Sequence, residues 1–175
     1  MKMKLALLAA AALIAFGMKR HYAEARADDL AWVLTPTARV VGAITNTTFA
    51  LLPGEGYLSR DRLFLIEKSC AGINFMIAAF GMLTLALIHR VGSGRSAARV
   101  LGVGLVASYA ATVAINATRI AIAMWLAAHP VARSTFSAAA VHRVEGIAVY
   151  FGGLMLLYEL AQVLDRRAAP GAPTS

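Results

Sequence analysis

The stretch CAGINFMIAAFGMLTLALI, residues 70–88, decides the fold class of this chain. Almost all of its side chains are apolar, and Asn74 is the chief exception. About 20 consecutive apolar residues in a helix are enough to cross the hydrocarbon core of a bilayer. Residues 70–88 therefore predict a transmembrane helix, and the rest of the chain can be organised around it.

The composition of the whole chain also predicts a membrane protein. Of its 175 residues, 59% are hydrophobic and 15% are charged, and the mean hydropathy is +0.67. Soluble domains carry about 25% charged residues, and a core of this size could not bury the excess apolar surface. The net charge of +8 does not predict nucleic-acid binding, because the basic residues stand in short clusters between apolar runs.

Three further apolar segments predict membrane helices, and they cover residues 5–18, 100–128 and 144–164. The segment 100–128 is too long for one ordinary span. The segment 5–18 follows two lysines and has the shape of a signal peptide. Because Lys19 and Arg20 stand before the small residues where cleavage would occur, we expect an uncleaved first span; a cleaved signal peptide is the alternative.

Residues 30–53 form the least regular apolar segment. They are rich in Thr, Val and Ala, but prolines, Arg39 and Asn46 interrupt them. We interpret them as a re-entrant or interfacial element, with a full span as the alternative. The predicted fold class is all-α, a polytopic integral membrane helix bundle with about four to five transmembrane helices. One membrane-embedded domain covers residues 1–167, and residues 168–175 are expected to be a disordered tail.

Basic residues in short loops favour the cytoplasmic side of a membrane. On that side we place the N-terminal lysines, the Gly/Ser loop 89–99 with its arginines, and the pair Arg166 and Arg167. The polar segment 54–68 must lie outside the lipid. With four spans, the residues that carry the candidate chemistry share the outer face: Cys70, Arg119 and His142. If residues 30–53 also span, the orientation inverts, but the three residues still share one side.

Arg119 is a charged residue inside a predicted span, where its transfer into lipid would cost free energy. A charged side chain in such an apolar run usually faces the interior of a helix bundle or a cavity, although an arginine that extends to the membrane surface is the alternative. Asn116 precedes it by three residues, so both point to about the same face of a helix. An amide beside a guanidinium group favours a polar pocket over contact with lipid.

Cys70 and His142 are the other candidates. Cys70, the single cysteine, is expected in the first turn of a helix, where the helix N-terminus favours a thiolate and Lys68 acts in the same direction. Gly72 lacks a side chain and could admit a substrate backbone. A structural or lipidated cysteine is the alternative. His142 precedes the last span and titrates near neutrality; a polar end-cap is the alternative.

Together, the three residues supply the groups needed for acyl transfer. A thiolate attacks, an imidazole carries a proton, and a cation stabilises the developing negative charge. The four histidines and the one cysteine lack the spacing of metal ligands, so we expect neither a metal nor another cofactor.

The ordered pattern C-A-G-I at residues 70–73, N-x-x-R-I at 116–120 and H-x-x-x-G at 142–146 resembles the exosortase/archaeosortase family. The resemblance covers about residues 64–164, and the short chain is similar to the compact branch called exosortase K. It implies a multi-pass transpeptidase of the bacterial inner membrane with its active site on the periplasmic side. The implied substrates are exported proteins whose C-terminal tail combines a short signature motif, a transmembrane helix and a basic cluster.

The same resemblance implies roles for individual residues. Cys70 corresponds to the nucleophile, His142 to the general acid and base, and Arg119 to the group that stabilises the transition state. Asn116 matches a motif position, and we expect it to support Arg119. The chain lacks several N-terminal spans of the longer members, which leaves open its substrate motif and any need for a partner protein.

Two other functions remain open from the sequence. The chain could be a non-catalytic membrane subunit of an export or polysaccharide assembly system, in which case Cys70 would be dispensable. It could also be a small transporter, although transporters usually contain repeated halves and none is visible here. In every case, membrane lipid is an expected partner and nucleic acid is not.

Overall fold

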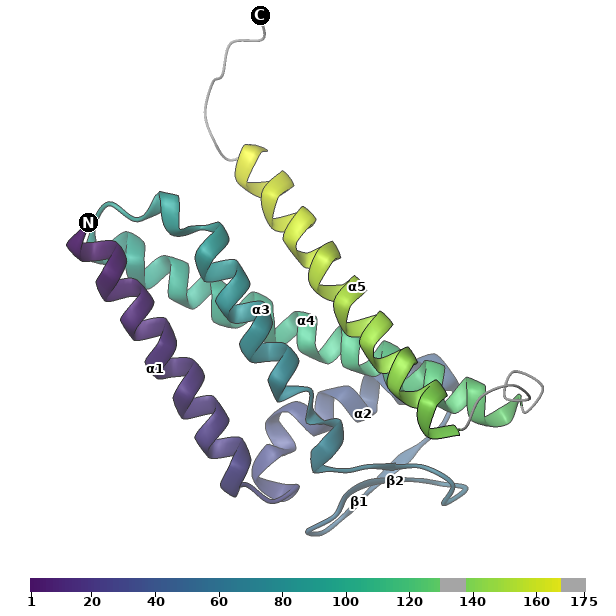
Figure 1. The fold of residues 1–175 in the computed structure, drawn as a ribbon. Helices are drawn as coiled ribbons and strands as arrows, with labels where there is room; N and C mark the ends of the chain where they lie inside the picture. The colour runs from purple at the N-terminus through teal and green to yellow at the C-terminus, as the bar shows by residue number, and fades with distance from the viewer. Residues whose placement is uncertain (130–137, 168–175) are drawn as a thin grey trace, which may run out of the picture.

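The computed structural model describes residues 1–129 and 138–167, and describes side chains for residues 1–129 and 143–167. The described chain is mainly helical, as predicted (Figure 1). The α-helices are α1 (Lys2–Glu24), α2 (Ala31–Thr45), α3 (Ile73–Ala86), α4 (Gly94–Ala128) and α5 (Ala138–Arg167). Single 3₁₀ turns precede α2, α3 and α4: η1 (Asp28–Leu30), η2 (Lys68–Ala71) and η3 (Ile88–Arg90). The predicted tail, residues 168–175, lies outside the described residues.

Three helical segments of the described chain are long and apolar enough to cross a membrane. They are Lys68–Ala86, Gly94–Ala128 and Arg143–Arg167. They correspond to the predicted spans at residues 70–88, 100–128 and 144–164, whereas α1, which contains the predicted span 5–18, is not among them. At a rise of about 1.5 Å per residue, the 35 residues of α4 extend for about 52 Å. This single helix is therefore longer than the ~30 Å hydrocarbon core, as the length of its apolar run predicted.

The ends of these helices differ from the predicted ones. The expected loop 89–99 is shorter, because Ser93 caps α4: its hydroxyl accepts a hydrogen bond from the backbone N–H of Ser96 at 3.2 Å. Arg95 and Arg99 consequently belong to the helix. At the other boundary, α5 begins at Ala138, so His142 belongs to this helix while still preceding its apolar segment Arg143–Arg167.

A small antiparallel sheet is the main feature that the sequence did not predict. It contains β1 (Phe49–Leu52), β2 (Gly56–Ser59) and β3 (Leu65–Ile66), in the order β1-β2-β3. Its register pairs Phe49 with Ser59 and Tyr57 with Ile66. The interpretation of residues 30–53 as one element was therefore wrong. Asn46 ends α2 in the left-handed conformation, with φ 52°, and the chain then enters the sheet.

Pro36 does not interrupt α2, because another helix compensates for it. A proline inside a helix has no N–H to donate to the carbonyl four residues earlier, here that of Trp32. The Tyr109 hydroxyl of α4 donates a hydrogen bond to this carbonyl at 2.8 Å, and the two aromatic rings stack with centroids 5.8 Å apart. This contact fastens α2 to α4 at the end of the molecule that also contains the sheet.

Seven of the 17 basic residues lie at the opposite end of the molecule, while others, such as Arg26, Arg60 and Lys68, lie at the sheet end. There the start of α1 meets the start of α4, since Leu7 packs with Val91 and Val100. The end of α5 joins them, because Arg90 donates a hydrogen bond from Nη2 to the backbone carbonyl of Asp165 at 2.8 Å. This end carries the cationic residues that the sequence grouped together: Lys2, Lys4, Arg90, Arg95, Arg99, Arg166 and Arg167.

One face of α4 presents a buried stripe of small and polar side chains to α3. Its members are spaced by four residues, about one helical turn each: Gly104, Ser108, Thr112 and Asn116. The hydroxyls of Ser108 and Thr112 donate to carbonyls of their own helix, at 2.9 and 2.6 Å. Because both hydroxyls are hydrogen-bonded, Ser108 and Thr112 can be buried without leaving a polar group unsatisfied. The stripe leads along α4 to the candidate site.

Candidate functional site

Cys70 lies in η2, and the adjacent Gly72 determines how this turn joins α3. Gly72 adopts φ 67° and ψ 17°, a left-handed conformation that other L-residues adopt at a cost. The α-helix begins only after it, at Ile73. The expectation that Cys70 lies in the first helical turn was therefore wrong, because the left-handed glycine separates the cysteine from the helix. The Cys70 side chain is half-buried, with Sγ 3.8 Å from the hydroxyl oxygen of Ser69.

Gly72 also has a different role from the predicted one. A Cβ at this position would lie 3.1 Å from Cγ2 of Thr112 and 3.3 Å from Cγ of Asn116. The space that was expected to admit a substrate backbone is thus occupied by side chains of α4. Gly72 lets the turn that carries Cys70 approach α4 closely.

Lys68 lies near Cys70 in the sequence, but it binds α1. Its ammonium group donates a hydrogen bond to the carbonyl of Ala23 at 3.2 Å and lies 5.2 Å from the centroid of the Tyr22 ring. These contacts differ from the expected position of Lys68 beside the thiol. They anchor η2 to the end of the first helix.

Asn116 connects the cysteine turn to the rest of the site. It is completely buried, and its Nδ2 donates a hydrogen bond to the backbone carbonyl of Cys70. Its Oδ1 accepts hydrogen bonds from the Tyr150 hydroxyl at 2.8 Å and from Nε of Arg119 at 3.4 Å. The prediction that Asn116 and Arg119 share one helix face is confirmed. The sequence had not indicated that the amide also reaches the cysteine turn.

Arg119 belongs to α4, and its side chain lies between α4 and α5. It is only 8% exposed, which argues against an arginine that extends to the membrane surface. The guanidinium carbon lies 5.4 Å from the centroid of the Tyr150 ring, within the range of a cation–π contact. A Cβ at Gly146 would lie 3.9 Å from Cδ of Arg119, so the backbone of α5 passes close by. The hydrogen bond from Arg119 to Asn116 uses one of the five N–H donors of the guanidinium group.

The sequence reasoning missed two residues of α5. Tyr150 contacts Asn116 and Arg119, and its ring also stacks on Phe75 of α3 with centroids 5.4 Å apart. The hydroxyl is close enough to Cys70 and Glu145 for electrostatic interaction with both. Glu145 itself is buried, with 9% exposure. A helical projection from His142 could have found Tyr150, since Gly146 and Tyr150 follow at intervals of four residues.

The side chain of His142 lies outside the described residues. The backbone at this position belongs to α5 and precedes Gly146 by one helical turn, about 6 Å along the helix axis. Of the predicted site residues, the structure therefore brings together Cys70, Asn116 and Arg119, with Gly72 packed against them. The predicted distance between Cys70 and His142 stays a prediction.

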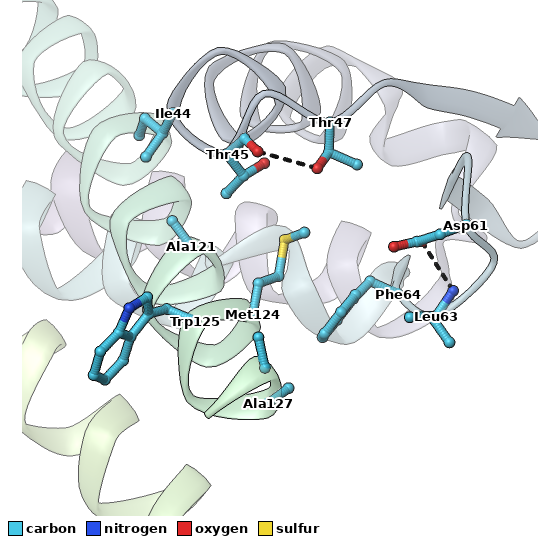
Figure 2. Close-up of a pocket in the computed structure, with 11 residues that line it drawn as sticks. Ile44, Thr45, Thr47, Asp61, Leu63, Phe64, Ala121, Met124, Trp125 and Ala127 are labelled. Atoms are coloured by element: carbon cyan, nitrogen blue, oxygen red, sulfur yellow. Dashed lines mark hydrogen bonds between the residues drawn. The ribbon is translucent and has the colours of Figure 1, made fainter. Parts of the chain in front are cut away.

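A pocket of about 710 Å³ lies beyond Asn116, toward the end of α4. In Figure 2, Met124 of α4 and Phe64 of the β2–β3 turn border this space, which is mostly apolar. Met124 belongs to the hydrophobic core cluster, and Phe64 packs against that cluster, as Cys70 does. The other lining residues come from α2, the β2–β3 turn and α4: Ile44, Thr45, Thr47, Asp61, Leu63, Ala121, Trp125, Ala127 and Ala128.

Asp61 is the only acidic residue among those that line this pocket. The hydroxyl of Ser59 and the backbone N–H of Leu63 donate hydrogen bonds to its carboxylate and hold its pKa below the ordinary value of 3.8. The pocket thus has an apolar floor and a negatively charged group at its edge.

Among the described residues, no three His, Cys, Asp or Glu side chains gather closely enough to hold a metal ion. Comparison of the chain with the profiles of known protein families, with curated protein sequences and with solved structures finds no match. The chemistry of this site is therefore inferred from its own geometry and from the motif resemblance.

Proposed function

We propose that this protein is an integral membrane cysteine transpeptidase or peptidase that cleaves and sorts exported proteins at a C-terminal sorting signal. The observation that carries the proposal is the position of Asn116, whose amide contacts both the Cys70 turn and Arg119. Asn116 thus holds the backbone of the turn that carries the thiol next to a buried cation, and acyl transfer needs a nucleophile and a cation near each other.

The proposed reaction begins at the Cys70 sulfur. The thiolate attacks the carbonyl carbon of the scissile peptide bond, and the carbonyl oxygen acquires negative charge in the tetrahedral intermediate. When the intermediate collapses, the C–N bond breaks, the amine leaves with a proton from His142, and a thioester to Cys70 remains. An amine acceptor or water then attacks the thioester and regenerates the thiol.

Arg119 would stabilise the oxygen that becomes negative. It is held by hydrogen bonding to Asn116 and by the ring of Tyr150, so little reorganisation is needed when charge develops. Removal of one such preorganised donor typically costs about 10²–10³ in turnover. The burial of Arg119 strengthens the effect, because water screens the interaction less.

The membrane arrangement in this proposal contains four spans. Helix α1 joins the three apolar segments described above, while α2 and the sheet lie at the outer surface. The basic end faces the cytoplasm, so Cys70 faces the periplasm of a bacterial inner membrane. Trp125, near the end of α4, supports this boundary, because it is exposed and tryptophan is enriched where membrane meets water.

The pocket farther along α4, whose described lining contains none of the proposed catalytic residues, is the proposed place where a substrate arrives from the membrane. Its apolar lining and the charge of Asp61 suit a peptide segment that leaves the lipid just before the cleavage position. The proposed substrates are exported proteins anchored by a C-terminal transmembrane helix with a basic end. Their basic end would lie on the same side of the membrane as the basic end of this protein.

The test uses an exported protein with such a tail, tagged on both sides of the expected cleavage position and expressed in the native host. Wild-type protein should release the C-terminal tag, and Cys70→Ala should leave the substrate intact while still inserting normally. Thr118→Ala is the matched control and should cleave, because the Thr118 hydroxyl is exposed and donates a hydrogen bond only to the Ala114 carbonyl of its own helix. Equal cleavage by Cys70→Ala would reject the proposal and favour a non-catalytic membrane subunit.

A further inference from the structure

We infer that Tyr150 is a positioning residue of this site: its hydroxyl orients the Asn116 amide, and that amide holds the Cys70 turn. The inference rests on the proposed function for its catalytic consequence. Its geometric part concerns only the reactivity of the Cys70 thiol, which can be measured without a substrate.

The orientation of the Asn116 amide follows from its neighbours. Nε–H of Arg119 can only donate a hydrogen bond, and the backbone carbonyl of Cys70 can only accept one. The amide oxygen must therefore face Arg119 and the amide nitrogen must face Cys70, as the structure has them. At 3.4 Å the bond from Arg119 is long, whereas the Tyr150 hydroxyl lies 2.8 Å from the same oxygen. Tyr150 thus supplies the shorter contact that keeps the amide in place.

The ring of Tyr150 fixes the hydroxyl in this position. One contact joins the ring to the Arg119 guanidinium group of α4, and another stacks it on Phe75 of α3. Tyr150 therefore contacts two other helices at once. Replacing the hydroxyl alone, as in Tyr150→Phe, leaves both ring contacts available and removes the hydrogen bond to Asn116 together with any contact of the hydroxyl with Arg119.

Tyr150 is also an anchor for a helix that is otherwise loosely packed. Within the apolar part of α5 only 6% of the residues are buried, compared with 39% within the apolar part of α4. Neighbours of Tyr150 such as Ile147 and Phe151 are 64% and 66% exposed. Because His142 lies on the same helix two turns earlier, the Tyr150 contacts also restrict where that turn lies relative to the Cys70 turn.

The experiment compares wild-type protein, Tyr150→Phe and Tyr158→Phe in detergent micelles. Tyr158 lies on the same helix and is 38% exposed, so its variant is the matched control. Cys70 is the only cysteine, and its alkylation by iodoacetamide across neutral and alkaline pH therefore reports on this thiol alone. The same proteins are assayed for kcat and KM with a tail peptide as substrate.

Tyr150→Phe is expected to shift the pH profile of Cys70 alkylation and to lower kcat about tenfold, the usual effect of one lost hydrogen bond, with KM unchanged. Tyr158→Phe should match the wild type in all three quantities. In an Asn116→Ala background, Tyr150→Phe should have no further effect, because the partner of the hydroxyl is already absent.

An unchanged alkylation profile in Tyr150→Phe would overturn the inference, whether or not kcat falls. An additive effect in the Asn116→Ala background would also overturn it. A failure of the proposed function can be distinguished from a failure of this inference. If the proposed function is wrong, cleavage persists in Cys70→Ala. The pH dependence of Cys70 alkylation still tests whether Tyr150 controls the cysteine turn.

Discussion

The side-chain amide of Asn116 donates a hydrogen bond to the backbone carbonyl of Cys70, 46 residues earlier in the chain. The same amide accepts a hydrogen bond from Arg119 through its oxygen. A change in the position of either group must therefore be transmitted to the other through one buried side chain. This coupling leads to predictions that separate stability from reactivity.

Replacement of Asn116 should destabilise the protein as well as reduce cleavage. Asn116→Ala leaves the buried carbonyl of Cys70 and the hydroxyl of Tyr150 without this partner, at a cost of about 1–3 kcal/mol in the free energy of unfolding. Thermal unfolding in detergent, followed by the exposure of Cys70 to a thiol reagent, measures the loss. Asn74→Ala is the control, because Asn74 accepts its hydrogen bond from Lys19 at an exposed position. Equal stability of the two variants would contradict the bridging role.

Arg119 should be sensitive even to replacement by lysine. A lysine keeps the charge but lacks the planar fork of N–H donors that binds Asn116 and faces the Tyr150 ring. We expect cleavage by Arg119→Lys to fall about 10²–10³-fold, with normal insertion into the membrane. Arg95→Lys, at the basic end of α4, should cleave like the wild type. Full activity in Arg119→Lys would mean that charge alone is needed, and full activity in Arg119→Ala would refute the role.

Gly72 should tolerate no added side chain. Gly72→Ala combines a left-handed backbone, which costs about 1–3 kcal/mol for other residues, with a contact at 3.1 Å to Thr112. Adding Thr112→Ser removes the Cγ2 atom of that contact and should restore part of the lost stability. Gly81→Ala in α3 meets nothing within 4 Å and should stabilise the helix by up to about 1 kcal/mol. Similar melting temperatures for Gly72→Ala and Gly81→Ala would contradict the close packing of the cysteine turn.

The β2–β3 turn should depend on pH through Asp61. Since folding lowers the pKa of this carboxyl below 3.8, the ionised form stabilises the folded state at pH values above 3.8. That stability is lost as the pH falls through the lowered pKa. Asp61→Asn should therefore melt below the wild type at neutral pH, and the difference should shrink in acid. Glu55→Gln, in the β1–β2 turn, controls for the change in net charge; a difference for Asp61→Asn that is constant with pH would argue against the prediction.

The helical spans and the pairing of Asn116 with Arg119 were predictable, because both depend on local quantities: apolar length and the 3.6-residue period of a helix. The sheet was not, since its short strands are joined by turns with positive-φ residues such as Gly54 and Arg62. The role of Gly72 depends on Thr112, which is 40 residues away and visible only after packing. Tyr150 escaped notice because a tyrosine in an apolar helix is usual, and only its neighbours from α3 and α4 distinguish it.

The most direct test of the central claim is capture of the covalent intermediate on Cys70. Wild-type protein is mixed with a tail peptide and quenched in acid, and the peptide fragment containing Cys70 is examined by mass spectrometry. The account predicts an added mass equal to the acyl part of the substrate, on the single cysteine and removable by hydroxylamine, as for a thioester. Cleavage of the same peptide without any such adduct, continuing in Cys70→Ala, would contradict it.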